Sequence, residues 1–163
     1  MMATAKSSKI IGILGSLFVV LSIGLSISVA AQDDPKGREI GHDGHCIAYA
    51  SGVVWDTKAG LEWLSGPDEN TMWDEAMRWV DNLTVAAGGW RMPTPDELKT
   101  LYEKGRGTRN MTPLLETTGW YVWSEETKDS SSAWGFYFLI GYRVEESRRA
   151  SSNFRAFAVR SRK

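Results

Sequence analysis

Apolar residues recur at helical spacing in two stretches of the chain, and each stretch predicts a helix. The first begins at Thr71, with Asp74 three residues later as its capping partner, and ends near Leu83. Its apolar face comprises Trp73, Ala76, Met77, Val80 and Leu83. The opposite face is charged, so we expect one side of this helix to pack on a core and the other to face water.

The second predicted helix follows a glycine pair and opens within Trp90-Arg91-Met92-Pro93-Thr94-Pro95-Asp96-Glu97-Leu98. Thr94 is the expected N-cap, a proline occupies the first helical position, and Glu97 completes a capping box. The helix is expected to close near residues 104–105. The segment holds neither a nucleophile nor a base, so we interpret it as scaffold.

Short runs of β-branched and aromatic residues predict strands on both sides of these helices. The expected strands are residues 53–56, 61–64, 121–124, 133–140 and 154–160. The first two form a hairpin, and residues 125–132 and 145–153 are expected to be polar loops. A hairpin, two helices and a strand-rich C-terminal half together predict an α+β domain.

The N-terminal region has the pattern of an export signal. Lys6 and Lys9 precede an uncharged run over residues 10–31, which ends in the small-residue cleavage pattern Ser28-Val29-Ala30. Without cleavage, the same run is long enough to span a bilayer as an anchor. Both alternatives place the rest of the chain outside the cytoplasm, in the periplasm or the extracellular space.

These features divide the chain into three segments. Residues 1–30 are the expected signal peptide or uncleaved anchor, residues 31–45 a polar linker, and residues 46–163 a folded domain. The membrane is therefore expected to contact the protein only through the N-terminal segment, if that segment is retained.

Composition and charge narrow the classes of function. The 163 residues are 42% hydrophobic and carry a formal net charge of -1, which argues against a nucleic-acid-binding protein. From residue 141 onward, however, seven basic residues face two glutamates, a net charge of +5 (7 − 2). The basic residues of this tail are Arg143, Arg148, Arg149, Arg155, Arg160, Arg162 and Lys163.

The single cysteine excludes a disulfide within one chain and leaves a pairing between chains, and hence an oligomer, open. Cys46 follows His42 and His45 in a Gly-His-Asp-Gly-His-Cys segment, whose residue types bind zinc or copper. The spacing matches no paired-ligand pattern and no second cluster follows. We therefore assign no metal and no cofactor, and leave open whether these three residues bind a metal.

Five short motifs, in this order, resemble the Lcl C-terminal domain family, a bacterial module otherwise described as of unknown function. They lie at residues 57–63, 73–76, 90–98, 121–124 and 157–160, and the resemblance covers about residues 40–162. It implies a C-type-lectin-like fold, with two helices beside a small twisted antiparallel sheet and the termini close together. We expect a structural role for Trp63, Trp73, Trp90, Arg91, Pro93, Thr94, Glu97, Leu98 and Trp123.

The resemblance also bears on function. Members are exported or surface proteins, and the collagen-like adhesin that names the family binds sulfated polysaccharides as a trimer through this domain. This chain has no collagen-like tract, so trimerisation does not follow. Formylglycine-generating enzymes share the fold but need a cysteine pair, and this chain has no cysteine after Cys46.

We therefore expect a non-catalytic binding module whose late loops hold an anionic or sulfated polysaccharide. The expected ligand contacts are the aromatic residues Trp134, Tyr137 and Tyr142 and the arginines Arg143, Arg148 and Arg149. The alternative is a cell-envelope module that binds other proteins. A third hypothesis, an enzyme of the formylglycine-generating type without its cysteines, lacks a nucleophile–base pair, and we predict no enzymatic activity.

Overall fold

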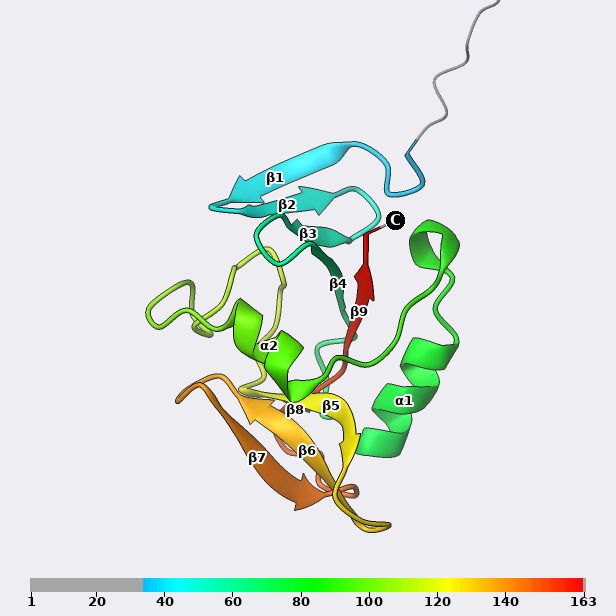
Figure 1. Ribbon diagram of the computed structural model, residues 1–163, viewed down its shortest axis with the longest axis vertical. Coiled ribbons are helices and arrows are strands. Elements are labelled where there is room, and N and C mark those ends of the chain that lie inside the picture. Colours follow the sequence, from blue (N-terminus) through cyan, green and yellow to red (C-terminus); the bar gives the residue numbers. More distant parts are fainter. Residues whose placement is uncertain (1–33, 163) are drawn as a thin grey trace, which may run out of the picture. The chain divides into compact units, whose positions relative to one another are not determined.

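Residues 34–162 of the chain are described by a computed structural model, in which two β-sheets and two α-helices form the domain (Figure 1). The predicted signal segment lies outside these residues. Among the described residues, no helix has the length and apolar character needed to cross a bilayer.

The first sheet is antiparallel, with five strands in the order β1-β2-β3-β4-β9. Its strands are β1 (Glu39–Asp43), β2 (Cys46–Tyr49), β3 (Val54–Asp56), β4 (Leu61–Ser65) and β9 (Phe157–Ser161). The predicted hairpin is confirmed as β3 and β4, and Gly60 in its turn has a φ of 71°, which favours glycine.

Residues 39–43, which we expected to lie in a linker, form β1 and pair with β2. The strand lies at the edge of the sheet and is largely exposed, so its polar residues suit an edge position. Composition alone therefore misplaced the start of the ordered domain.

The second sheet has four strands in the order β7-β6-β5-β8. They are β5 (Tyr121–Thr127), β6 (Ser132–Tyr137), β7 (Tyr142–Ser147) and β8 (Phe154–Arg155). The pairs are antiparallel except β5 and β8, which run parallel. The α+β class is thus confirmed, whereas the single small antiparallel sheet that the resemblance implies is replaced by two sheets.

The prediction of one long strand over residues 133–140 is wrong at its end. The strand stops at Tyr137 and turns through Gly141, whose φ is 76°. The chain then returns as β7, an exposed edge strand where we expected a loop from residue 145. Exposed and buried side chains hardly alternate along β7, so the hydrophobic pattern of the sequence does not reveal this strand.

Helix α1 (Trp73–Asp81) begins one residue later than predicted. Met72 is the N-cap, and its backbone N–H donates to Glu75 at 2.8 Å, while the hydroxyl of Thr71 donates to the carbonyl of Glu69. Helix α2 (Pro95–Leu101) has the predicted N-terminus and ends earlier than predicted. The Thr94 hydroxyl accepts from the N–H of Glu97 at 3.1 Å, and Glu97 accepts from the N–H of Thr94 at 2.9 Å.

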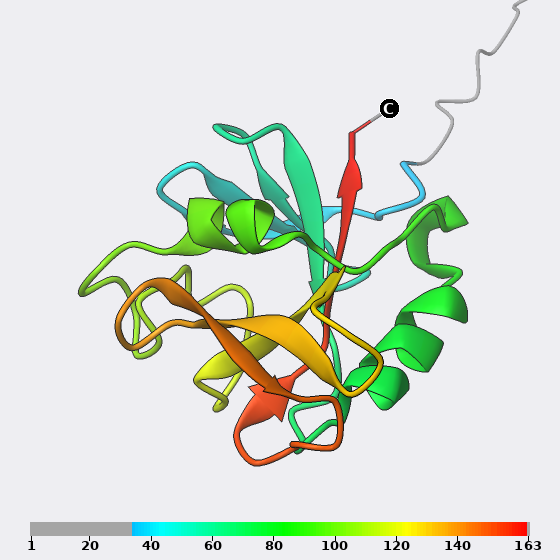
Figure 2. The same cartoon turned by 60° about the horizontal axis from the view of Figure 1, so that its bottom comes forward.

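The first sheet separates two apolar clusters, because successive side chains of a strand point to opposite faces. Strand β9 runs between the two helices (Figure 1, Figure 2). Trp63 lies in the cluster with α2, and Trp123 in the cluster with α1; both are fully buried. Of the nine residues expected to be structural, six are buried: Trp63, Trp73, Trp90, Pro93, Leu98 and Trp123. Thr94 and Glu97 are half-buried, and Arg91 is exposed.

An ion pair ties loops far apart in sequence to β8. Arg155 donates to Asp68 at 2.6 Å, and the N–H of Thr118 donates to the same carboxylate oxygen at 2.9 Å. Although burial raises the pKa of Asp68, the hydrogen bonds from Arg155 and Thr118 lower it to about 2. The carboxylate therefore stays ionised and holds the loops in place over most of the acidic range.

Candidate functional site

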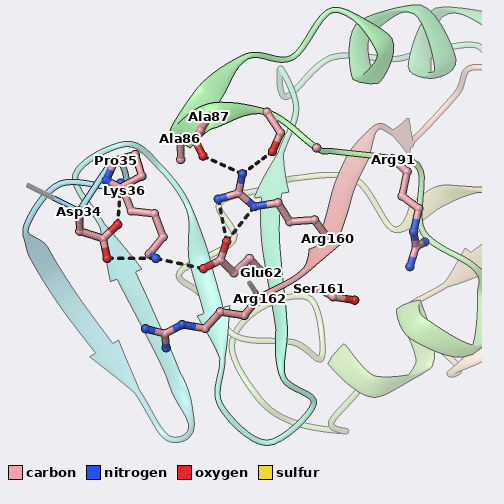
Figure 3. A pocket seen from close by; sticks show the side chains of 12 residues that line it. Asp34, Pro35, Lys36, Glu62, Ala86, Ala87, Arg91, Arg160, Ser161 and Arg162 are labelled. Atoms are coloured by element: carbon pink, nitrogen blue, oxygen red, sulfur yellow. Dashed lines mark hydrogen bonds and ion pairs between the residues drawn. The ribbon is translucent and has the colours of Figure 1, made fainter. Parts of the chain in front are cut away.

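A cleft of about 530 Å³ lies between three segments of the domain: residues 34–36, the loop 86–89 and the end of β9 (Figure 3). Its charged lining residues are Asp34, Lys36, Glu62, Arg91, Arg160 and Arg162. Four cations thus face two carboxylates of the lining, and Glu97 outside it pairs with Arg91, which leaves a local net charge of +1 (4 − 3).

Both carboxylates are held by groups of the cleft itself. Glu62 and Arg160 are register partners on β4 and β9, and the Arg160 Nε and Nη2 lie 2.8 and 2.7 Å from one oxygen of Glu62. The other oxygen lies 3.2 Å from Lys36, which also pairs with Asp34 at 3.1 Å. Burial lowers the pKa of Lys36, but its bonds to Asp34 and Glu62 raise it further, so the amine stays charged.

Arg160 also fixes the loop that forms one rim of the cleft. Its Nη1 donates to the carbonyl of Ala86 at 2.8 Å and to the carbonyl of Gly88 (Figure 3). Four consecutive residues in this loop have positive φ: Ala86 (48°), Ala87 (71°), Gly88 (70°) and Gly89 (80°). The left-handed conformation costs about 1–2 kcal/mol for a residue other than glycine, so the alanines are strained. Strain of this kind, held by surrounding bonds, is found at functional sites.

An indole ring lies beside this loop, outside the lining of the cleft. The Arg160 guanidinium lies 4.3 Å from the centre of the Trp90 ring, and the Trp90 Nε1 donates to the carbonyl of Val85 at 2.8 Å. Trp90 thus holds the rim at Val85, which lies in the short 3₁₀-helix Val85–Ala87. It also supports Arg160 through a cation–π contact.

Two arginines lie at the edge of the cleft. Arg91 is exposed and binds Glu97 through two hydrogen bonds of 2.8 and 2.5 Å. Arg162 stacks on Trp55 at 3.6 Å and, among the described residues, forms no ion pair. An anionic ligand can therefore bind the guanidinium of Arg162 without displacing a carboxylate partner.

The structure divides the six predicted ligand contacts among different places. Trp134 and Arg143 share one face of the second sheet, where the guanidinium lies 4.5 Å from the ring centre and covers one side of the indole. Tyr137 and Tyr142, register partners on β6 and β7, alternate to the opposite face. Tyr137 stacks on Tyr121 at 4.2 Å, which occupies one face of its ring.

Arg148 and Arg149 are adjacent in sequence but lie in different surroundings. Arg148 lies 4.2 Å from the Trp73 ring centre, pairs with Asp74 and donates to the carbonyl of Ser130, so it fastens β7 to the start of α1. Arg149 is exposed in the following turn. The six residues form no common surface in the described structure, and none lines the cleft. Their contact with a ligand stays a prediction.

Sequence reasoning did not find the cleft, because Glu62 and Arg160 are 98 residues apart and meet only through the pairing of β4 with β9. The usable signal was the excess of positive charge in the C-terminal tail, which includes Arg160 and Arg162.

The three residues of the possible metal segment do not converge. His42 is exposed on β1 and lies 3.3 Å from Glu39. His45 and Cys46 instead lie beside Asp56, and one ligand atom of each of these three residues lies within 4.8 Å of the others. His45, Cys46 and Asp56 therefore form a cluster of metal-ligand side chains that is separate from the lining of the cleft.

A comparison with family models identifies one match, described as the Lcl C-terminal domain, over residues 52–160. It covers the chain from β3 into β9, including the loop 86–89 and both Glu62 and Arg160. Lys36 and Arg162 lie outside it. A comparison with curated proteins gives no match.

Proposed function

The chain belongs to the Lcl C-terminal domain family, and from this premise we propose that it is an exported, non-catalytic module that binds anionic polysaccharide in the cleft. The observation that carries the proposal is the imbalance of charge there. The carboxylates of Asp34 and Glu62 are already paired with Lys36 and Arg160, so the electrostatic potential that a ligand meets in the cleft is positive.

The chemistry of the lining favours sulfate or carboxylate groups on a sugar chain. A guanidinium presents its donors as a planar fork that matches both groups, and Arg162 offers such a fork on a rigid indole support. The volume falls within the range of about 300–1,000 Å³ typical of small-molecule sites. One or a few sugar units of a polymer are therefore the expected occupant.

A binding role suits the other groups of the cleft better than a catalytic one. Neither histidine lines it, and the buried Glu62 is locked by Lys36 and Arg160. General acid–base catalysis needs a group that is free to exchange a proton at the reacting atom. Glu62 is instead held in ion pairs with both of these cations.

Location and fold class complete the proposal. The basic–apolar–small pattern of residues 1–30 supports export to the periplasm or the extracellular space. Membership of the family, together with two helices flanking β9, supports a C-type-lectin-like arrangement.

A protein-binding module in the cell envelope is the second candidate, and one observation favours it. The turn between β6 and β7 exposes the apolar residues Leu139 and Ile140, and Tyr142 beside them is 70% exposed. Exposed apolar groups in one turn suit a protein partner. Such a contact would be insensitive to salt, which distinguishes it from the cleft.

Retention on immobilised polysaccharides tests the main proposal. We expect the protein to bind sulfated and uronate polymers at low ionic strength, to lose most of that binding as salt rises, and to ignore neutral dextran. Binding to neutral and anionic polymers alike, or binding to none of them, contradicts the proposal.

A further inference from the structure

Three metal-ligand side chains converge where β2 and β3 pair, and none of them lines the cleft. Cys46 and Asp56 are register partners on β2 and β3, so their side chains lie next to each other on one face. His45 precedes β2 and brings its Nε2 to 3.5 Å from the carboxylate of Asp56. Cys46 and Asp56 are both 1% exposed, while the His45 side chain is 30% exposed.

We propose that His45, Cys46 and Asp56 bind a divalent cation of the zinc type. Thiolate, imidazole and carboxylate are the ligands of zinc sites, and three protein ligands leave a fourth position for water. Their ligand atoms lie within 4.8 Å of one another. A tetrahedral zinc separates its ligand atoms by about 3.5 Å. A shift of the half-exposed His45 imidazole can bring the ligand atoms to this separation. Its exposed side also gives an ion access from the solvent.

The charge balance of this cluster favours a divalent ion. A thiolate and a carboxylate together neutralise a 2+ charge. The positive charge of Arg106 also acts on Cys46, and Asp43 offsets part of it, because its carboxylate lies 2.8 Å from the Arg106 Nε and 2.7 Å from the Nη2. The pairing with Asp43 therefore reduces the repulsion between Arg106 and a bound cation.

The binding step balances with the loss of one proton. Cys46 is a free, buried cysteine. The sulfur–metal bond forms as the thiol proton leaves to the solvent, and no electron is transferred.

Cobalt(II) in place of zinc provides a direct test on the purified chain. We expect a sulfur-to-cobalt charge-transfer band in the near ultraviolet and intense visible bands of a tetrahedral site, both bleached by added zinc. His45→Ala should weaken cobalt binding by about tenfold or more, the least that loss of a direct ligand should cost. Cys46→Ser should remove the charge-transfer band.

The matched control is His42→Ala, which removes the other histidine of the same segment and should leave the spectrum and affinity unchanged. His45 is partly exposed, so its replacement keeps the test valid even if Cys46→Ser unfolds. Absence of the charge-transfer band in the unmodified chain overturns the proposal, as does equal affinity in His45→Ala.

Discussion

At the scale of single residues, the recurring unit of this protein is an arginine laid on a tryptophan. Five of the eight tryptophans carry a guanidinium over the ring. These rings are Trp55, Trp73, Trp90, Trp120 and Trp134. Each pair lets the indole bury its apolar area while the cation stays near water, which explains how a small domain accommodates so many tryptophans.

Trp90→Ala tests the arginine–tryptophan pair that lies beside the cleft, which is formed by Arg160 and Trp90. Removal of a buried indole should cost about 3–5 kcal/mol of unfolding free energy, because it leaves a cavity and frees the carbonyl of Val85. Chemical denaturation measures the loss. The matched change is Trp134→Ala, in which the half-buried ring also carries an arginine, and it should cost clearly less. Equal losses would show that burial does not set the role of Trp90.

The sequence predicts burial at these positions better than it predicts their partners. Trp63, Trp90 and Trp123 are buried as expected from their apolar settings. For Arg148, by contrast, nothing in the sequence indicates that it stacks on Trp73 and pairs with Asp74. A basic residue in a polar stretch gives no sign of which aromatic ring lies across the fold.

At the scale of elements, helix starts were predicted reliably and several strands were not. Helix α2 begins where Thr94 and Glu97 predict it, because a capping box is a contact within four residues. Strands β1 and β7 were missed, because an edge strand is exposed and carries polar residues as a loop does. The short interior strand β2 was missed as well, and the strand predicted over residues 154–160 is in fact two strands, β8 and β9, in different sheets. The order of the two sheets depends on pairings between distant segments, which periodicity does not encode.

Thr94→Ala probes the best-defined local signal. The substitution removes the hydroxyl that accepts from the N–H of Glu97 and should cost about 1 kcal/mol of unfolding free energy. Urea denaturation at constant pH measures it. Thr100→Ala deletes the same atoms from an exposed position in the same helix and serves as the control. If the two variants lose equal stability, the cap does not hold α2.

At the scale of the whole domain, the cleft is a product of topology. Strand β9 returns from the end of the chain to pair with β4, and this pairing brings Arg160 to Glu62 and Arg162 to Trp55. Residues 34–36 close the other side, so the beginning and the end of the described chain share one site. The positive tail seen in the sequence is thereby divided: Arg143 and Arg149 lie elsewhere, and Arg160 and Arg162 line the cleft.

The most direct measurement is the dissociation constant for a sulfated polysaccharide, compared between Arg162→Ala and Arg149→Ala at low ionic strength. Both variants lose one exposed arginine and the same charge, but only Arg162 lines the cleft. We predict that Arg162→Ala weakens binding about tenfold or more, as expected for loss of a charged hydrogen bond, and that Arg149→Ala binds like the unmodified protein. Normal binding by Arg162→Ala together with weakened binding by Arg149→Ala would contradict the account and move the site to the turn after β7.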